Sequence, residues 1–216
     1  MILLIDNEPD AVLADRCMFF RMGLHSLVCR PDAITTMIFK PVHTVLIMRP
    51  EYIEDLPAVC HEIRQYFFRV PLAMMYRPPH GNYYMYLQLA DAVFDDNVTT
   101  AHFANFMYDL YKRNTGIDVR DMIYDCVRAI AGTHYICICG ERLPATHEQV
   151  MLTRYLLFRA PRAAAVEDLR QACFNPARLP QLSNVHTQFS RLNKTILRGT
   201  DLRKIHYKRD IGYFIL

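Results

Sequence analysis

The stretch that decides the fold of this chain is its last part, residues 183–216: SNVHTQFSRLNKTILRGTDLRKIHYKRDIGYFIL. If residues 184–198 form a helix, the apolar side chains of this segment fall in one narrow stripe. The members of that stripe are Val185, Phe189, Leu192 and Ile196. Such an arrangement predicts a helix that docks on the rest of the protein by one side only.

The opposite side of the same predicted helix is polar and mostly basic. Its side chains are Thr187, Arg191, Lys194 and Arg198, with Gln188 on the flank. These side-chain types read base edges and hold phosphates in the major groove of DNA. Taken alone, the stretch also fits a solvated basic helix that binds nothing.

Two short segments after this helix, at residues 202–207 and 212–216, predict a β-hairpin around Lys208 and Arg209. The hairpin tip, together with His206, would reach the DNA backbone or a minor groove. If the protein does not bind DNA, the same segments form a plain surface hairpin.

The region before the helix predicts the rest of a compact domain. Thr146 followed three residues later by Gln149 is a capping-box pattern that opens a helix. A second helical segment, residues 165–174, stops at an Asn-Pro pair. Short strands are expected at residues 122–130 and 135–139. Together with the helix and hairpin above, these elements predict an α+β winged helix-turn-helix domain.

The charge of the chain is unevenly distributed. The net charge is only +3, but residues 1–115 hold 10 Lys and Arg against 13 Asp and Glu, a balance of −3. Residues 116–216 hold 15 against 9, a balance of +6. Between Arg178 and Arg209 there are eight basic residues and one acidic residue. This asymmetry favours two domains, of which the second faces a polyanion.

The first half alternates between apolar strands and amphipathic helices. Strands are expected at residues 2–5, 27–29, 42–48, 70–75 and 92–94. Helices are expected at residues 11–22, 33–39 (capped by Asp32), 57–68, 83–89 and 100–112. Five such alternations predict an α/β domain with a doubly wound, five-stranded parallel sheet. We place this domain at residues 1–113, a linker at 114–120 and the second domain at 121–216.

Composition argues against several classes of protein. No apolar run approaches the roughly 18 residues of a membrane span, and the N-terminus lacks a signal-peptide pattern, so we expect a cytoplasmic protein with no membrane partner. The seven scattered Cys residues are interpreted as reduced thiols. Cys137 and Cys139 could bind a metal near His134, but structural zinc usually needs four ligands. We therefore expect no metal and no cofactor.

One acidic loop still raises the question of a metal. Asp6, Asn7 and Glu8 directly follow the first predicted strand. In open parallel sheets, ligands sit at the carboxyl ends of the strands, and carboxylates there commonly hold a hard cation.

The helix from Val185 to Lys194 resembles the recognition-helix signature of the OmpR/PhoB family of winged-helix response regulators. Residues 210–213 are similar to the closing wing of that family, residues 143–149 to the segment that opens its first helix, and residues 4–9 to the end of the first receiver strand. The resemblance covers essentially the whole chain. It implies a receiver-like domain joined to a winged helix, dimerisation through the last helix–strand–helix face of the receiver, and transcriptional control through double-stranded DNA and RNA polymerase.

The resemblance also implies that the phosphorylation pocket is degenerate. In the family, an aspartate at the end of the third strand accepts a phosphoryl group with the help of magnesium, and a hydroxyl residue and a lysine sense the new charge. The acceptor position here falls at Met48 or Arg49, the hydroxyl position at Tyr76, and the lysine position at Asp95 or Asp96.

Asn7 replaces one of the usual acids, so magnesium would lose a ligand there as well. We hypothesise that Arg49 lies near Asp6 and Glu8, replaces the charge of the metal and locks the receiver-like domain in one state. The alternative is a metal site that still works.

The favoured interpretation is a sequence-specific DNA-binding transcription regulator that acts without aspartyl phosphorylation, as a homodimer. Thr187, Gln188 and Arg191 are the candidates for contacts with base edges. The candidates for phosphate or wing contacts are Lys194, Arg198, His206, Lys208 and Arg209. Because Asn193 stands where the family often has a basic residue, the resemblance implies a weaker grip on phosphate at that position.

The second interpretation is a protein-interaction module whose pseudo-receiver binds another regulator or a kinase. The Tyr- and Met-rich segment at residues 83–86 would suit such an interface, although a dimer contact or core packing explains it better. An enzyme is not expected, because the Cys and His residues form no nucleophile–base set and no Gly-rich phosphate loop is present.

Overall fold

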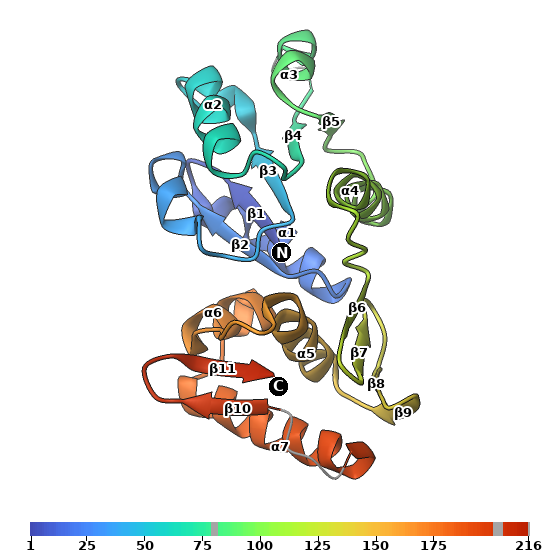
Figure 1. Cartoon of the computed structure of the whole chain (residues 1–216). Helices are drawn as coiled ribbons and strands as arrows, with labels where there is room; N and C mark the ends of the chain where they lie inside the picture. The colour runs from blue at the N-terminus through green and yellow to red at the C-terminus, as the bar shows by residue number, and fades with distance from the viewer. Residues whose placement is uncertain (79–81, 201–204, 216) are drawn as a thin grey trace. The chain divides into compact units, whose positions relative to one another are not determined.

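The computed structural model describes residues 1–78, 82–200 and 205–215, without the side chains of residues 100–101 and 197–200 (Figure 1). The chain forms two compact units. The first unit consists of Met1–Met18 and Ser26–Asp118, and the second of Phe19–His25 and Val119–Leu216.

The first unit is built on an all-parallel sheet with the strand order β2-β1-β3-β4-β5. Its strands are β1 (Ile2–Ile5), β2 (Ser26–Cys29), β3 (Thr44–Met48), β4 (Leu72–Tyr76) and β5 (Ala92–Asp95). β1 and β3 are buried along their full length, as apolar runs covered on both faces must be. This order is that of the doubly wound receiver-like fold, so the predicted fold class of this half is confirmed.

Helices flank the sheet between its strands. The α-helices are α1 (Leu13–Arg21), α2 (Leu56–Tyr66), α3 (Tyr83–Leu89) and α4 (Thr100–Thr115), and short 3-10 helices are η1 (Pro9–Val12), η2 (Pro31–Met37) and η3 (Pro50–Tyr52). The helix expected at residues 11–22 is thus divided between η1 and α1. The last helix, α4, runs into the expected linker and ends at Gly116, whose φ of 76° lies in the left-handed region.

The predicted α-helix at residues 33–39 is wrong. The segment is the 3-10 helix η2, which begins at Pro31, and Arg30 rather than Asp32 stands at its N-cap, without a capping bond from its side chain. The physical reason lies in residues 34–36 (Ile-Thr-Thr), because three β-branched side chains in a row lose rotamer freedom in an α-helix.

The second unit combines an antiparallel sheet with helices and a hairpin (Figure 1). The sheet contains β6 (Asp121–Tyr124), β7 (Val127–Ile130), β8 (Tyr135–Ile138) and β9 (Glu141–Pro144). The elements that follow are α5 (His147–Arg159), α6 (Val166–Cys173), η4 (Pro176–Arg178), α7 (Leu182–Thr200), β10 (Ile205–Lys208) and β11 (Gly212–Ile215). The predicted α+β winged helix-turn-helix fold is therefore confirmed.

Two of the expected strands in this unit were placed too broadly. A turn at Asp125, whose φ is 52°, divides residues 122–130 into β6 and β7. The next strand ends at Ile138, because Cys139 (φ 51°) and Gly140 (φ 88°) form the tight connection to β9. Cys139 is consequently exposed on a turn and does not share a strand face with Cys137.

The capping box that opens α5 is confirmed. Thr146 Oγ1 accepts from the backbone N–H of Gln149 at 3.2 Å, and Gln149 Oε1 accepts from the backbone N–H of Thr146 at 2.8 Å. Most of α5 is buried, so it forms the centre of the second unit. Among the helices that the structure describes, none is both long and apolar enough to cross a membrane.

Candidate nucleic-acid interface and receiver pocket

The recognition-helix candidate α7 docks by the stripe that the sequence predicts. Val185, Phe189, Leu192 and Ile196 are each at most 1% exposed. Because these residues recur every three or four positions, their side chains lie on one face and anchor the whole helix. The predicted orientation of α7 is therefore confirmed.

The outward face of α7 carries the polar residues predicted to contact DNA. Thr187, Arg191 and Lys194 are exposed, and Gln188 is half-buried. Within the part of the chain that the structure describes, neither Arg191 nor Lys194 forms an ion pair or a side-chain hydrogen bond. The side chain of Arg198 lies outside the described residues. The face therefore presents cations whose charge is not neutralised by described neighbours.

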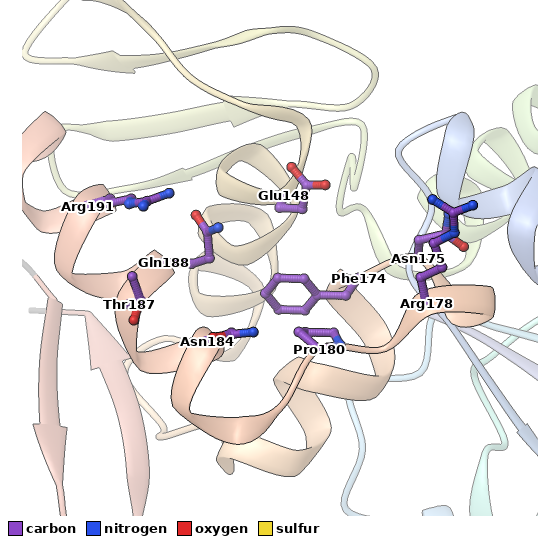
Figure 2. A pocket seen from close by; sticks show the side chains of 9 residues that line it. All are labelled: Glu148, Phe174, Asn175, Arg178, Pro180, Asn184, Thr187, Gln188 and Arg191. Carbon is purple, nitrogen blue, oxygen red and sulfur yellow. The ribbon is translucent and has the colours of Figure 1, made fainter.

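A groove of about 450 Å³ runs beside this face (Figure 2). Its lining residues are Glu148, Phe174, Asn175, Arg178, Pro180, Asn184, Thr187, Gln188 and Arg191. Figure 2 shows Gln188 and Arg191 on one side of Phe174 and Arg178 on the other. Sequence reasoning missed Arg178 and Glu148 as parts of this surface, because they come from η4 and α5, and only the fold brings them beside α7.

The wing candidates lie on the hairpin of β10 and β11. Lys208 and Arg209 are exposed at its turn, and His206 is half-buried with its ring stacked on Phe214 at 5.7 Å. Gly212 is required where β11 begins, because a Cβ atom there would lie 2.0 Å from Ala164 O. The hairpin thus keeps its basic tip in solvent while its base packs closely.

Asn193 differs from its expected role. The resemblance placed it among phosphate-facing positions, but its side chain is 6% exposed and bonds to the backbone of Ile205. On a helix it follows Phe189 by four residues and precedes Ile196 by three, and those spacings were the available sign of burial.

In the first unit, Arg49 occupies the acidic pocket. Its Nε donates to Asp6 Oδ2 at 2.9 Å and its Nη2 to Asp6 Oδ1 at 2.5 Å. Glu8 Oε2 lies 3.4 Å from both terminal nitrogens. Asp6 is almost fully buried, whereas Glu8 is largely exposed. The ion pair that we hypothesised between Arg49 and the two carboxylates is therefore present.

The local backbone explains how Arg49 reaches this pocket. Arg49 follows β3 directly and has φ 49° and ψ 56°, a left-handed conformation that ends the strand before η3. Met48, the other candidate for the acceptor position, remains buried within β3. The pKa of Arg49 is raised, first by its hydrogen bonds to Asp6, so the guanidinium stays charged.

The other expected pocket residues do not converge on one ligand site. Asn7 Nδ2 donates to Tyr52 O at 2.5 Å. The ring of Tyr76 lies against Tyr83 and Tyr86, with centroid distances of 6.0 and 5.9 Å. Asp95 Oδ1 accepts from Asn97 N at 2.9 Å, and Asp96 lies 3.7 Å from Arg77. Among the described residues, no cluster of three or more His, Cys, Asp or Glu is placed to hold a metal.

Asp15 is a carboxyl group that feels the charges of this pocket and that sequence reasoning missed. Burial raises the pKa of its carboxyl group, and Arg77 opposes that rise, with smaller effects from Asp6 and Arg49. Asp15 lies in the first turn of α1, so nothing in its own segment links it to the pocket.

Solved structures with a related fold include the response regulator DrrB of Thermotoga maritima, described as an OmpR/PhoB homologue. It shares 12% identity over 99% of this chain and 97% of its own, with a TM-score of 0.43. A redox sensor of the streptococci, described as evolved from two-component response regulators, shares 12% identity over 100% and 99%, with a TM-score of 0.39.

The DNA-binding domain of the response regulator AdeR, solved in complex with an intercistronic region, shares 18% identity over 43% of this chain and 96% of its own, with a TM-score of 0.39. No family model matches the chain, and no curated protein does. At these identities and TM-scores the likeness carries no conclusion about function, and the fold class rests on the strand order and elements described above.

Proposed function

We propose that this chain is a sequence-specific DNA-binding transcription regulator of the OmpR/PhoB response-regulator type, and that it acts without aspartyl phosphorylation. The observation that carries the proposal is α7, which is anchored by a buried stripe and presents Thr187, Arg191 and Lys194 to solvent. A docked helix with this outward face suits the major groove of DNA.

The residues divide into two kinds of contact. Thr187, Gln188 and Arg191 would read base edges, since Arg and Gln can make paired hydrogen bonds to guanine and adenine. Lys194 and the wing residues Lys208 and Arg209 would hold phosphates, which sets register but carries no sequence information. His206 and Arg198 complete the proposed set.

The receiver pocket supports independence from phosphorylation. Arg49 is one of the two candidates for the acceptor position, and its two bonds to Asp6 use the oxygens that a magnesium ion would need. Titration of the full chain with magnesium and acetyl phosphate, followed by NMR, should leave the resonances of β1 and β3 unchanged. Saturable shifts there would contradict this part of the proposal.

A homodimer through α3, β5 and α4 is the assembly we propose. Tyr84 and Tyr83 on α3 are 79% and 42% exposed, whereas Tyr86 is 2% exposed and belongs to the core. Exposed Tyr side chains favour an interface. Two winged helices in one dimer would read half-sites about one helical turn apart. Sedimentation should show a dimer for the unaltered chain and a monomer for Tyr84→Arg.

The test of the whole proposal is binding of the purified, untreated protein to fragments of its own genome at two salt concentrations. We expect selective enrichment of a repeated site without any phosphodonor. Weak, unselective binding that vanishes at the higher salt would contradict the proposal and favour the alternative, a protein-interaction module that docks another regulator or a kinase.

A further inference from the structure

The buried face of α7 contains one polar side chain whose role the proposed DNA contacts do not explain. Asn193 is 6% exposed, although Arg191 and Lys194 on the same turn are exposed. A buried carboxamide is unfavourable unless both its donor and its acceptor are satisfied. Asn193 therefore needs a buried hydrogen-bond partner that offers both a donor and an acceptor.

That partner is the backbone of Ile205, the first residue of β10. Asn193 Nδ2 donates to Ile205 O at 2.8 Å, and Ile205 N donates to Asn193 Oδ1 at 3.1 Å. Ile205 is fully buried and lies opposite Ile215 in the hairpin. The side chain of Asn193 thus forms hydrogen bonds with both the N–H and the C=O of Ile205, as the backbone of a neighbouring strand would.

The hairpin needs such support because it is small. Each of its two strands has four residues, and an isolated two-stranded hairpin is marginally stable in water. The other strand is held through Tyr213, whose ring stacks on Phe189 at 3.8 Å and whose hydroxyl lies 2.5 Å from His186 Nδ1. Asn193 is the corresponding polar attachment of β10 to α7.

We propose that Asn193 is a positioning residue for DNA binding: it fixes the wing to the recognition helix, so that both engage one DNA site in a set register. This inference rests on the proposed DNA-binding function. Asn193 itself would not contact DNA. It would act through Lys208 and Arg209, which are exposed at the hairpin turn that β10 leads into.

The test is DNA affinity against salt for Asn193→Leu, which keeps a similar volume and removes both hydrogen bonds. Each phosphate contact contributes about 0.9 to the slope of log affinity against log salt concentration, and we expect the variant to lose the contacts of Lys208 and Arg209. A fourfold rise in salt should then weaken DNA binding by the unaltered protein about 12-fold more than binding by the variant. In a chain that carries Lys208→Ala and Arg209→Ala, Asn193→Leu should leave the salt slope unchanged. Asn114→Leu, at an exposed position of α4, is the matched control.

An equal loss of affinity in both backgrounds with an unchanged slope would overturn the proposal, because a general structural defect does not depend on the wing charges. Circular dichroism would show whether Asn193→Leu still folds. A second measurement needs neither the variant nor DNA: the backbone amide of Ile205 should exchange slowly with solvent in the unaltered protein. Fast exchange would overturn the proposed attachment of β10 by Asn193. If exchange is slow but DNA binding is unselective, only the proposed function is overturned.

Discussion

Two arginine side chains, Arg49 in the receiver-like unit and Arg191 in the winged-helix unit, are used in opposite ways. The side chain of Arg49 is 17% exposed, donates two hydrogen bonds to the carboxylate of Asp6 and lies 3.4 Å from Glu8. Arg191 is exposed on α7 and makes no ion pair or side-chain hydrogen bond within the described residues. The first charge is neutralised inside the protein, and the second lies in solvent, where the proposed DNA contact would use it.

The difference teaches that the residue type alone does not set the role. Arg49 follows a buried strand in a left-handed conformation that places it beside two carboxylates. Arg191 stands on the outward side of a helix whose inner stripe is fully used in docking. A pocket that is neutralised from within has less need of magnesium, whereas a basic face without ion pairs to described residues has the charge that DNA attracts.

The largest effect is expected when the internal pair is broken. Arg49→Ala would leave Asp6 buried without a counter-charge, so the free energy of unfolding should fall by about 3 kcal/mol, at the low end for buried pairs. Urea denaturation at neutral pH measures it. The control is Arg64→Ala, which removes a more exposed pair with Asp91 and should cost less than about 1 kcal/mol.

Adding Asp6→Asn to Arg49→Ala should restore much of the lost stability, because it removes the uncompensated charge. Equal losses from Arg49→Ala and Arg64→Ala would show that the pocket is effectively solvated and that the two arginine sites differ less than their geometry indicates.

The next effect concerns Arg191 and is measured as a change in DNA affinity. Arg191→Ala should weaken binding to the preferred site by roughly 1–3 kcal/mol and relax the preference at one base pair, because a paired contact with a base edge is lost. Competition between the preferred site and variants with single base changes measures this effect. A uniform loss on all of these sequences would move Arg191 from the base-reading to the phosphate-holding group.

The fold was largely predictable from the sequence because its signals are periodic. The apolar runs of β1 and β3 and the stripe of α7 reflect burial that each segment must satisfy by itself. The failures are local: η2 and the turn at Asp125 depend on β-branched crowding and on a left-handed residue, which periodicity does not report.

The candidate sites were predictable only in part, because pockets join residues that are distant in sequence. The pairing of Arg49 with Asp6 followed from the parallel sheet, since adjacent strands end at the same edge. Asp15 and Arg178 gave no such signal, and the helical position of Asn193 indicated burial but not its partner Ile205. Their partners come from other elements and are defined by the packed structure.

A smaller effect is expected at the other exposed cation of α7. Lys194→Ala should lower affinity by a similar factor on every DNA sequence and reduce the magnitude of the salt slope by about 1, as the loss of one phosphate contact requires. Binding isotherms at several salt concentrations, on specific and random duplexes, measure both quantities. A change in sequence preference with an unchanged slope would instead make Lys194 a base-reading residue.

The smallest effect concerns Asp15, at the edge of the pocket that Arg49 neutralises. Burial raises the pKa of Asp15 above 3.8, so its contribution to stability is fully present below pH 3.8 and is lost as the pH rises through the folded-state value. Asp15→Asn removes this titration and should therefore stabilise the protein at pH 7, by less than about 1 kcal/mol. The gain should shrink as the pH approaches 4 in urea denaturation series. A loss of stability at pH 7 would mean that the attraction of Arg77 for the Asp15 carboxylate outweighs the cost of burying it.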